Sequence, residues 1–390
     1  MSHVSLSVCS TYEANRVRDA VGECLGRLPA ARALLRPGAR VIVKPNLINA
    51  RPPDTAICTH PAVVRAVAEW ACAAGCQVTI ADEPGYALLA RAEPLFARAG
   101  ISQACEDLPV RYELLRMGGY VVASVPNPLR LAEVRVSAAL RDADVVINLP
   151  KCKTHGQTLL TGAIKNLFGG VAPRERIQIH GLGGFEGLSE AIVDAFACQR
   201  PQLTVMDAIV AMEGNGPTRG RPRPLGLVAA SGDAVALDAV MEHLAGFEPG
   251  EVRVTAAAGR QGLGECNLTR VQVDGYDIRR AHVPLERPPG LIRHGMPRWV
   301  GRVVSRHLWV RPAFDAARCV GCGACAAICP GGAIDMNGTA RVNYDRCIEC
   351  FCCQEVCPAD AIDSRESLLA RVVVGSSRRV TGRGSADPRR

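Results

Sequence analysis

The first 275 residues alternate short apolar runs with longer segments whose apolar residues recur on one helical face. A strand covered on both sides is apolar throughout, so the runs predict buried strands and the longer segments predict helices. The expected strands are 4–8, 40–43, 77–81, 144–149, 203–206, 227–230 and 271–273. The expected helices are 13–28, 61–74 with Thr59 as its N-cap, and 233–244. This alternation predicts an α/β domain with a mainly parallel sheet and helices on both faces.

Charged and amide side chains follow four of these strands. In open α/β sheets, ligands bind outside the carboxyl ends of the strands, so polar residues there predict a site. The residues are Lys44, Asn46, Asp82, Glu83, Lys151, Lys153 and Asp207. Each of them alone is equally well explained as a solvated loop residue. As a set, they favour a binding site at this edge of the sheet.

The choice of basic residues points to the same places. The net charge is +8 and 46 residues are basic, yet only four are lysine: Lys44, Lys151, Lys153 and Lys165. Lysine is a compact charge that can lose its proton, whereas arginine is planar and always charged. Surface solubility would be served by either residue, so it does not explain why three of the four lysines fall within fifteen residues. The lysines therefore indicate a site.

The segment 149–170 contains three of these lysines. Lys151, Lys153 and His155 alternate, so an extended segment would project them to one side. A helix beginning near Thr161 would add the positive potential of its first N–H groups. This combination predicts a ligand that carries a carboxylate or a phosphate, with Lys165 and Asn166 among its contacts.

One cysteine pattern occurs twice near the C-terminus. Each copy reads C-x2-C-x2-C-x3-C-P, and the second begins 28 residues after the first. This is the ligand spacing of a bacterial-type ferredoxin with two [4Fe–4S] clusters, in which the fourth cysteine of each copy binds the other cluster. The expected sets are Cys319, Cys322, Cys325 and Cys357, and Cys347, Cys350, Cys353 and Cys329. Zinc knuckles or disulfides are the alternatives, but a zinc site does not need the crossed Cys-Pro repeat.

The remaining cysteines follow no framework spacing and are expected to be reduced thiols in a cytosol. Cys352 breaks the repeat, because its counterpart 28 positions earlier is Ala324, and it is predicted to be dispensable for the clusters. Cys152, between two of the lysines, is expected to pack in the core. No apolar run has the length of a membrane span and residues 1–30 carry no signal peptide, so we expect a cytoplasmic protein.

The composition changes after residue 275. Residues 276–317 are rich in arginine and proline and are predicted to link the α/β domain, 1–275, to a small α+β cluster domain, 318–366. Apolar residues at helical spacing between Trp299 and Trp309 predict a basic amphipathic helix in this linker. Such a helix can bind a membrane or nucleic acid, but docking of the cluster domain is the simpler interpretation. Without a recognition motif we expect no nucleic acid partner, and the basic tail 367–390 is predicted to be disordered.

The glycine-rich run 177–187 raises a competing hypothesis. A strand, a glycine turn and a helix there, with Asp207 holding a ribose, would form a nicotinamide site. The spacing is G-x-G-x-x-x-G at best, which is weak support for that site. An isolated His155 or His180 is likewise more often structural than catalytic.

Four motifs resemble domain-of-unknown-function family 362, whose members are often fused to a ferredoxin module. They are VKPN at 43–46, LPKCKTH at 149–155, TGAIKNLFGG at 161–170 and MDAIVAMEGNGP at 206–217. The resemblance covers about 40–245 and implies this two-domain architecture. It also adds Glu213 and Asn215 of the last motif to the candidate ligand-binding residues. The family supplies no established reaction, so it implies no substrate.

These features support two functions. In the first, a possible iron–sulfur oxidoreductase passes electrons from a redox partner protein to an anionic substrate or cofactor. His155 would donate a proton, and Asp82 or Asp207 would act as a base or metal ligand. The expected ligand contacts are Lys44, Asn46, Lys151, Lys153, Lys165, Asn166, Glu213 and Asn215. In the second, the protein is a non-catalytic electron-transfer or metallocofactor-handling protein whose α/β domain recognises a partner. Whether a bound anionic compound is reduced would distinguish them.

Overall fold

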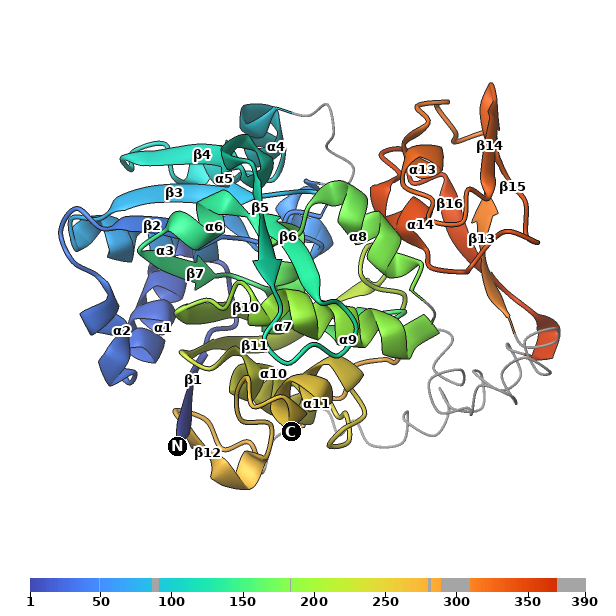
Figure 1. Ribbon diagram of the computed structural model, residues 1–390. Coiled ribbons are helices and arrows are strands. Elements are labelled where there is room, and N and C mark those ends of the chain that lie inside the picture. Colours follow the sequence, from blue (N-terminus) through green and yellow to red (C-terminus); the bar gives the residue numbers. More distant parts are fainter. Residues whose placement is uncertain (49, 86–90, 183, 280–281, 289–308, 370–390) are drawn as a thin grey trace, which may run out of the picture.

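The computed structural model of this protein describes residues 1–48, 50–85, 91–182, 184–279, 282–288 and 309–369 (Figure 1). Within them, one large mixed sheet has the strand order β12-β1-β11-β10-β7-β2-β3-β4, and β8 and β9 extend it from β10. Its strands are β1 (Ser2–Val8), β2 (Arg40–Lys44), β3 (Gln77–Asp82), β4 (Val110–Leu114), β7 (Val145–Asn148), β8 (Lys151–His155), β9 (Leu159–Thr161), β10 (Leu203–Glu213), β11 (Arg221–Ser231) and β12 (Val271–Asp274).

Most strand pairs in this sheet are parallel. β1 and β10 each run antiparallel to β11, and β8 runs antiparallel to β9, whereas the other pairs are parallel. The expected α/β class with a mainly parallel sheet is therefore confirmed. The carboxyl ends of β2, β3 and β7 meet at one edge, because these parallel neighbours run in register.

Helices cover both faces of the sheet, as the continuous apolar strands require. Alternate residues of one strand enter different cores: Val41 and Val43 pack on one side of β2 and Ile42 on the other. On the first side lie α1 (Ala14–Gly26) and α3 (Pro61–Ala73). On the second lie α7 (Ala163–Leu167), α9 (Gly184–Ala197), α10 (Ala234–Leu244) and α11 (Arg253–Arg260).

The remaining elements of this domain are short. They are the helices α2 (Pro29–Leu34), α4 (Ala92–Arg98), α5 (Ile101–Ala104), α6 (Ala138–Asp142) and α8 (Pro173–His180), and the hairpin of β5 (Tyr120–Ser124) and β6 (Glu133–Ser137). Among the residues that can be placed, no helix is long and apolar enough to cross a membrane.

Three local expectations were wrong. The N-cap of α3 is His60, whose Nδ1 accepts the N–H of Ala62, because the Thr59 hydroxyl instead donates to the Leu149 carbonyl oxygen at 2.6 Å. β10 continues to Glu213, so Asp207 lies inside a strand and not at its end. The glycine-rich run 177–187 begins in α8 and continues into α9. It therefore lacks the strand that a nicotinamide site would need.

The two copies of the cysteine motif in the cluster domain also have similar backbone conformations. β13 (Val310–Phe314) pairs with β16 (Ile362–Glu366), β14 (Ile334–Asn337) pairs with β15 (Thr339–Val342), and α13 (Ala324–Ala327) and α14 (Cys352–Val356) begin 28 residues apart. Positive φ angles recur at the same offset, at Gly321, Gly323 and Gly332 and at Glu349, Phe351 and Asp360. The two copies therefore share one backbone path, although the second lacks the glycines that favour it.

Both ends of the expected linker, 276–317, take part in folded units. Leu285 is buried in the α/β core and the Glu286 carbonyl accepts the N–H of Gly214. At the other end, β13 begins at Val310 and belongs to the cluster domain. The amphipathic helix expected between Trp299 and Trp309 falls almost entirely outside the described residues, as does the tail from residue 370.

Candidate functional site

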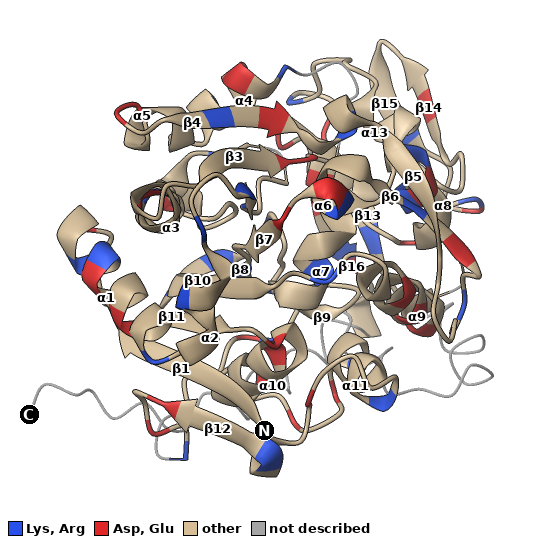
Figure 2. Ribbon diagram, turned by 60° about the vertical axis from the view of Figure 1, so that its left-hand side comes forward, with Lys and Arg blue, Asp and Glu red and all other residues tan. Residues whose placement is uncertain are grey.

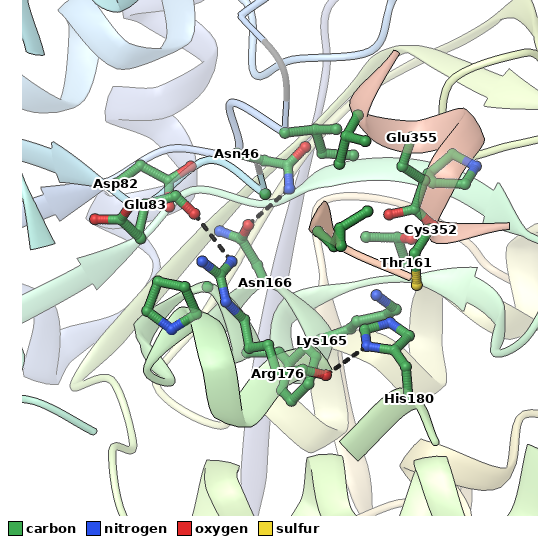
Figure 3. A pocket seen from close by; sticks show the side chains of 18 of the residues that line it. Asn46, Asp82, Glu83, Thr161, Lys165, Asn166, Arg176, His180, Cys352 and Glu355 are labelled. Carbon is green, nitrogen blue, oxygen red and sulfur yellow. Dashed lines mark hydrogen bonds between the residues drawn. The ribbon is translucent and has the colours of Figure 1, made fainter. Parts of the chain in front are cut away.

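A cavity of about 110 Å³ lies between the α/β domain and the cluster domain. Its walls are the ends of β2 and β3, the β8–β9 hairpin, α7 and α8 on one side, and α14 on the other (Figure 3). The polar residues that line it are Lys44, Asn46, Asp82, Glu83, His155, Thr161, Lys165, Asn166, Arg176, His180, Cys352 and Glu355. Of the residues that the sequence singles out, Lys151, Lys153, Asp207, Glu213 and Asn215 are not among them.

Lys44 and Asp82 form a buried ion pair at the end of the sheet. The Lys44 Nζ lies 2.7 Å from Asp82 Oδ1, and Asp82 Oδ2 accepts the N–H of Leu47 at 2.8 Å. Burial lowers the pKa of Lys44, and the charge of Asp82 opposes that shift. A Cβ atom on Gly169 would lie 3.1 Å from Lys44 Nζ, so this glycine leaves room for the pair. The pairing leaves Asp82 poorly suited to act as a free base.

A chain of amides fixes the loops behind the cavity. Asn46 Nδ2 donates to Asn166 Oδ1 at 2.9 Å, and Asn166 Nδ2 donates to Asn148 Oδ1 at 2.8 Å. Lys153 Nζ donates to Asn46 Oδ1 at 2.6 Å and to the Ile57 carbonyl oxygen at 2.5 Å. Burial lowers the pKa of Lys153 to about 7. Lys153 thus supports the wall of the cavity from behind, with its ammonium already hydrogen-bonded.

Lys151 belongs to a separate buried cluster. Its Nζ lies 2.8 Å from both Asp207 Oδ2 and the Tyr12 hydroxyl, and that hydroxyl donates to Asp207 Oδ1 at 2.8 Å. The N–H of His60 also donates to Asp207 Oδ2 at 2.9 Å, and the Tyr12 and His60 rings stack 3.6 Å apart. Figure 2 colours the basic residues of β8 and α7 blue. These residues have different neighbours: Asp207 for Lys151, Asn46 for Lys153 and the Phe168 ring for Lys165. The lysines of 149–170 therefore do not converge on one anion.

Neither Glu213 nor Asn215 lines the cavity, and among the described residues only Asn215 of the two has a partner in the cluster domain. Glu213 Oε1 accepts from Arg221 at 3.1 Å, and Asn215 Nδ2 donates to Ser364 Oγ at 2.9 Å. Arg51 adds to this contact by donating to Asp360 Oδ1 at 2.8 Å and to the Cys357 carbonyl oxygen at 3.1 Å. These polar contacts hold the cluster domain against the site.

The hydrogen bonds of two histidines determine where their protons lie. His155 Nδ1 accepts the N–H groups of Gln157 and Thr158, so the proton is on Nε2, which lies 3.5 Å from Glu355 Oε1. His180 Nδ1 lies 2.7 Å from the Arg176 carbonyl oxygen, which can only accept, so His180 Nε2 carries the free lone pair. Burial, with the nearby Lys165, lowers the pKa of His180 to about 4. His180 is therefore neutral at pH 7.

Two cations retain unused donors in the cavity. Among the described residues, the Lys165 ammonium has no hydrogen-bond or ion-pair partner and lies 5.8 Å from the centre of the Phe168 ring. Arg176 Nη1 donates to the Glu83 carbonyl oxygen at 3.1 Å, while its buried Nη2 has no partner there. Burial lowers the pKa of both groups. The sequence did not single out Arg176, because it is one arginine among many.

The cluster domain contributes Cys352 and Glu355 to the cavity. Both lie on α14, and burial raises the pKa of the Glu355 carboxyl while Lys165 opposes that shift. The counterparts of these two residues in the first copy of the repeat are Ala324 and Ala327. Comparing the copies would have drawn attention to Glu355 as one of several polar departures of the second copy, of which Glu349, Gln354 and Asp360 do not line the cavity.

The fold brings each expected set of four cysteines around one hollow. Cys319, Cys322, Cys325 and Cys357 line the first hollow, and Cys329, Cys347, Cys350 and Cys353 line the second. Cys329 and Cys357 accept N–H groups at 3.2 Å from equivalent residues, as thiolate ligands commonly do. No described His, Cys, Asp or Glu residues are grouped for a single metal ion. A cubane separates its ligands more widely, so the hollows fit clusters better than a lone metal ion.

Asp238 holds the first turn of α7, which carries Lys165. Its carboxylate accepts the N–H groups of Ala163 at 2.6 Å and Ile164 at 3.0 Å, so these N–H groups are not available to a ligand. The helix start expected to attract an anion is therefore already capped. A Cβ atom on Gly162 would lie 2.1 Å from Asp238 Oδ1, so this contact requires glycine.

We expect Asp238 to make the protein less stable as the pH rises. Burial raises its pKa from 3.8 to about 7, so the unfolded chain releases this proton first. The stabilisation that protonated Asp238 contributes is fully present below about pH 4. It is lost as the pH rises toward 7, by at most about 1.4 kcal/mol per pH unit. In urea denaturation across this range, Asp238→Asn should gain stability relative to wild type as the pH increases. A constant difference would contradict this, and Asp19→Asn, on an exposed residue, is the control.

Comparisons with known proteins agree with this architecture. Residues 41–243 match the domain of unknown function DUF362, and residues 311–358 match a 4Fe-4S dicluster domain. The thylakoid-associated protein sll1697 of Synechocystis sp. is 32% identical over 320 residues, which are 79% of this chain and 95% of that protein. The lactate racemase apoprotein from Thermoanaerobacterium thermosaccharolyticum aligns at 13% identity and a TM-score of 0.39, over 62% of this chain and 56% of its own. This chain belongs to the DUF362 family and carries a C-terminal iron–sulfur dicluster domain.

Proposed function

We propose that this protein exchanges single electrons between two [4Fe–4S] clusters and a small anionic ligand in the cavity between its domains. The observation that carries this proposal is the shared cavity, which is lined by Lys165 of the α/β domain and by Cys352 of α14. Cys352 is adjacent in sequence to Cys353 and two residues from Cys350, which are both expected cluster ligands. When bound in the two hollows, the clusters would supply single electrons at this wall.

The side chains that line the cavity have different roles in this proposal. The Lys165 ammonium binds one polar group of the ligand, because its donors have no partner among the described residues. His155 donates a hydrogen bond from Nε2 to the group that is reduced, because the backbone N–H groups on Nδ1 keep the ring neutral with its proton on Nε2. We assign no chemistry to Asp82 or Asp207, because each carboxylate is paired with a buried lysine.

Anaerobic purification followed by mass spectrometry of the co-purifying compound tests this function. Added back to dithionite-reduced protein, the compound should reoxidise the clusters and be recovered in reduced form. Lys165→Met should weaken its binding about ten- to a hundred-fold through one lost charge-assisted hydrogen bond. His155→Phe removes this donor and should slow reoxidation about 10²–10³-fold with little change in affinity.

The control is Arg174→Met, on an exposed residue of α8 outside the cavity. If the compound binds but is recovered unchanged while the clusters stay reduced, the α/β domain is a recognition module. The non-catalytic electron-transfer or cofactor-handling function would then replace this one.

A further inference from the structure

We propose that Arg176 is the second anchor of this cavity and that the ligand is a small carboxylic acid. Arg176 holds the carboxylate of this ligand, and the other functional group of the ligand lies at Lys165. This inference rests on the proposed function. Figure 3 shows the two side chains diverging, with the Arg176 guanidinium beside Asp82 and Glu83 and Lys165 beside His180 and Cys352.

The unused donor of Arg176 indicates a missing partner. Nη1 donates to the Glu83 carbonyl oxygen, but Nη2 is buried and has no partner among the described residues. A buried charged donor without an acceptor is costly, and folded proteins rarely leave one unsatisfied. Arginine stays charged even when buried, so the natural partner of this atom is an anion.

The neighbouring carboxylates do not neutralise Arg176. Glu83 Oε1 lies 2.7 Å from Arg116 Nη1, and Glu83 Oε2 accepts the N–H of Arg116 at 3.1 Å. Asp82 is paired with Lys44 at 2.7 Å. One positive charge therefore remains at this end of the cavity. A planar guanidinium matches one carboxylate, whereas a dianionic phosphate would bring a second negative charge that has no matching cation at this end of the cavity.

The size of the cavity limits the ligand further. A volume of about 110 Å³ corresponds to roughly ten water positions, which suits a small acid better than a nucleotide. At the other end, Thr161 is 3% exposed and its Oγ1 has no partner among the residues the structure places. Lys165 and Thr161 can thus receive a second polar group beside α14. The ligand is therefore expected to carry polar groups at both ends.

Binding to the full-length protein with oxidised clusters tests this assignment without electron transfer. The probes are 4-hydroxybutanoate, 4-oxopentanoate, their primary amides and inorganic phosphate, and the measurements are calorimetric affinity and thermal stabilisation. At least one acid should bind wild type, with its amide at least about ten-fold weaker. Arg176→Gln should weaken that acid about ten- to a hundred-fold at unchanged iron content, whereas Arg174→Gln should bind as wild type does.

Arg176→Lys provides a second variant if Arg176→Gln fails to fold. It keeps the charge but loses the planar fork, and it should also bind the acid more weakly. Four outcomes would overturn the assignment. Neither acid binds, phosphate binds more tightly than the acids, an acid and its amide bind equally, or the Arg176 variants bind with wild-type affinity. If an acid binds through Arg176 but reduced clusters leave it unchanged, this inference stands and the redox function fails.

Discussion

Replacing Asp207 with alanine is expected to lower the free energy of unfolding by about 3–5 kcal/mol, because it leaves the Lys151 ammonium buried without its counter-charge. Both side chains are almost fully buried, and their closest N and O atoms are 2.8 Å apart. The same change removes the acceptor of the Tyr12 hydroxyl and of the His60 N–H. Urea denaturation followed by circular dichroism, under anaerobic conditions, measures this loss.

The second substitution Lys151→Met in the Asp207→Ala background should restore part of the stability, because it removes the unpaired charge. Asp19→Ala, on an exposed residue of α1, is the control and should change stability by less than about 0.5 kcal/mol. A loss below about 1 kcal/mol in Asp207→Ala, together with abolished redox activity, would instead restore the expectation that Asp207 acts in the chemistry.

Cys350→Ala is expected to remove at least one cluster, whereas Cys352→Ala should leave the iron content unchanged. Wild-type protein purified without oxygen should hold about eight irons and eight acid-labile sulfides, and Cys350→Ala about four irons or fewer. Cys350 lines the second hollow with three other expected ligands, while Cys352 lines the cavity instead. Metal and sulfide analysis of the two variants compares cysteines only two positions apart under the same conditions.

This pair of variants also tests which cysteines bind the clusters. Loss of a whole cluster in Cys352→Ala would show that the wrong cysteine was chosen from the second copy of the repeat. Four irons or stoichiometric zinc in the wild type would overturn the two-cluster assignment altogether. Cys198→Ala, which changes a half-buried thiol far from both copies in sequence, controls for general sensitivity to cysteine loss.

A fragment that ends near Gly275 is not expected to bind the ligand as the whole chain does. The change in composition after residue 275 predicts a domain boundary there. However, α14, which this fragment lacks, forms one wall of the cavity. Such a fragment would also lose Leu285 from its core and the contact between Glu286 and Gly214. The domains are distinct in sequence, yet the candidate site belongs to both.

The sequence by itself determined the fold class, the cluster domain and the edge of the sheet where the cavity lies. These depend on local signals: apolar periodicity along one segment, and cysteine spacing within about 40 residues. Lys44, Asn46, Asp82, His155, Lys165 and Asn166 were predicted as site residues and line the cavity. The strand-end rule found Lys44, Asn46 and Asp82, because parallel neighbours place their carboxyl ends at one edge. The lysine-containing segment 149–170 supplied the other three.

Only the tertiary structure decided which charges are satisfied. Lys151 and Lys165 are alike in sequence, but the first pairs with Asp207 and Tyr12 while the second keeps its donors for the cavity. Tyr12 and Asp207 are 195 positions apart, so no local pattern could pair them. A charge is available to a ligand only if packing leaves it without a partner. That depends on contacts between distant segments, such as those that bring Arg176 and Glu355 to one cavity.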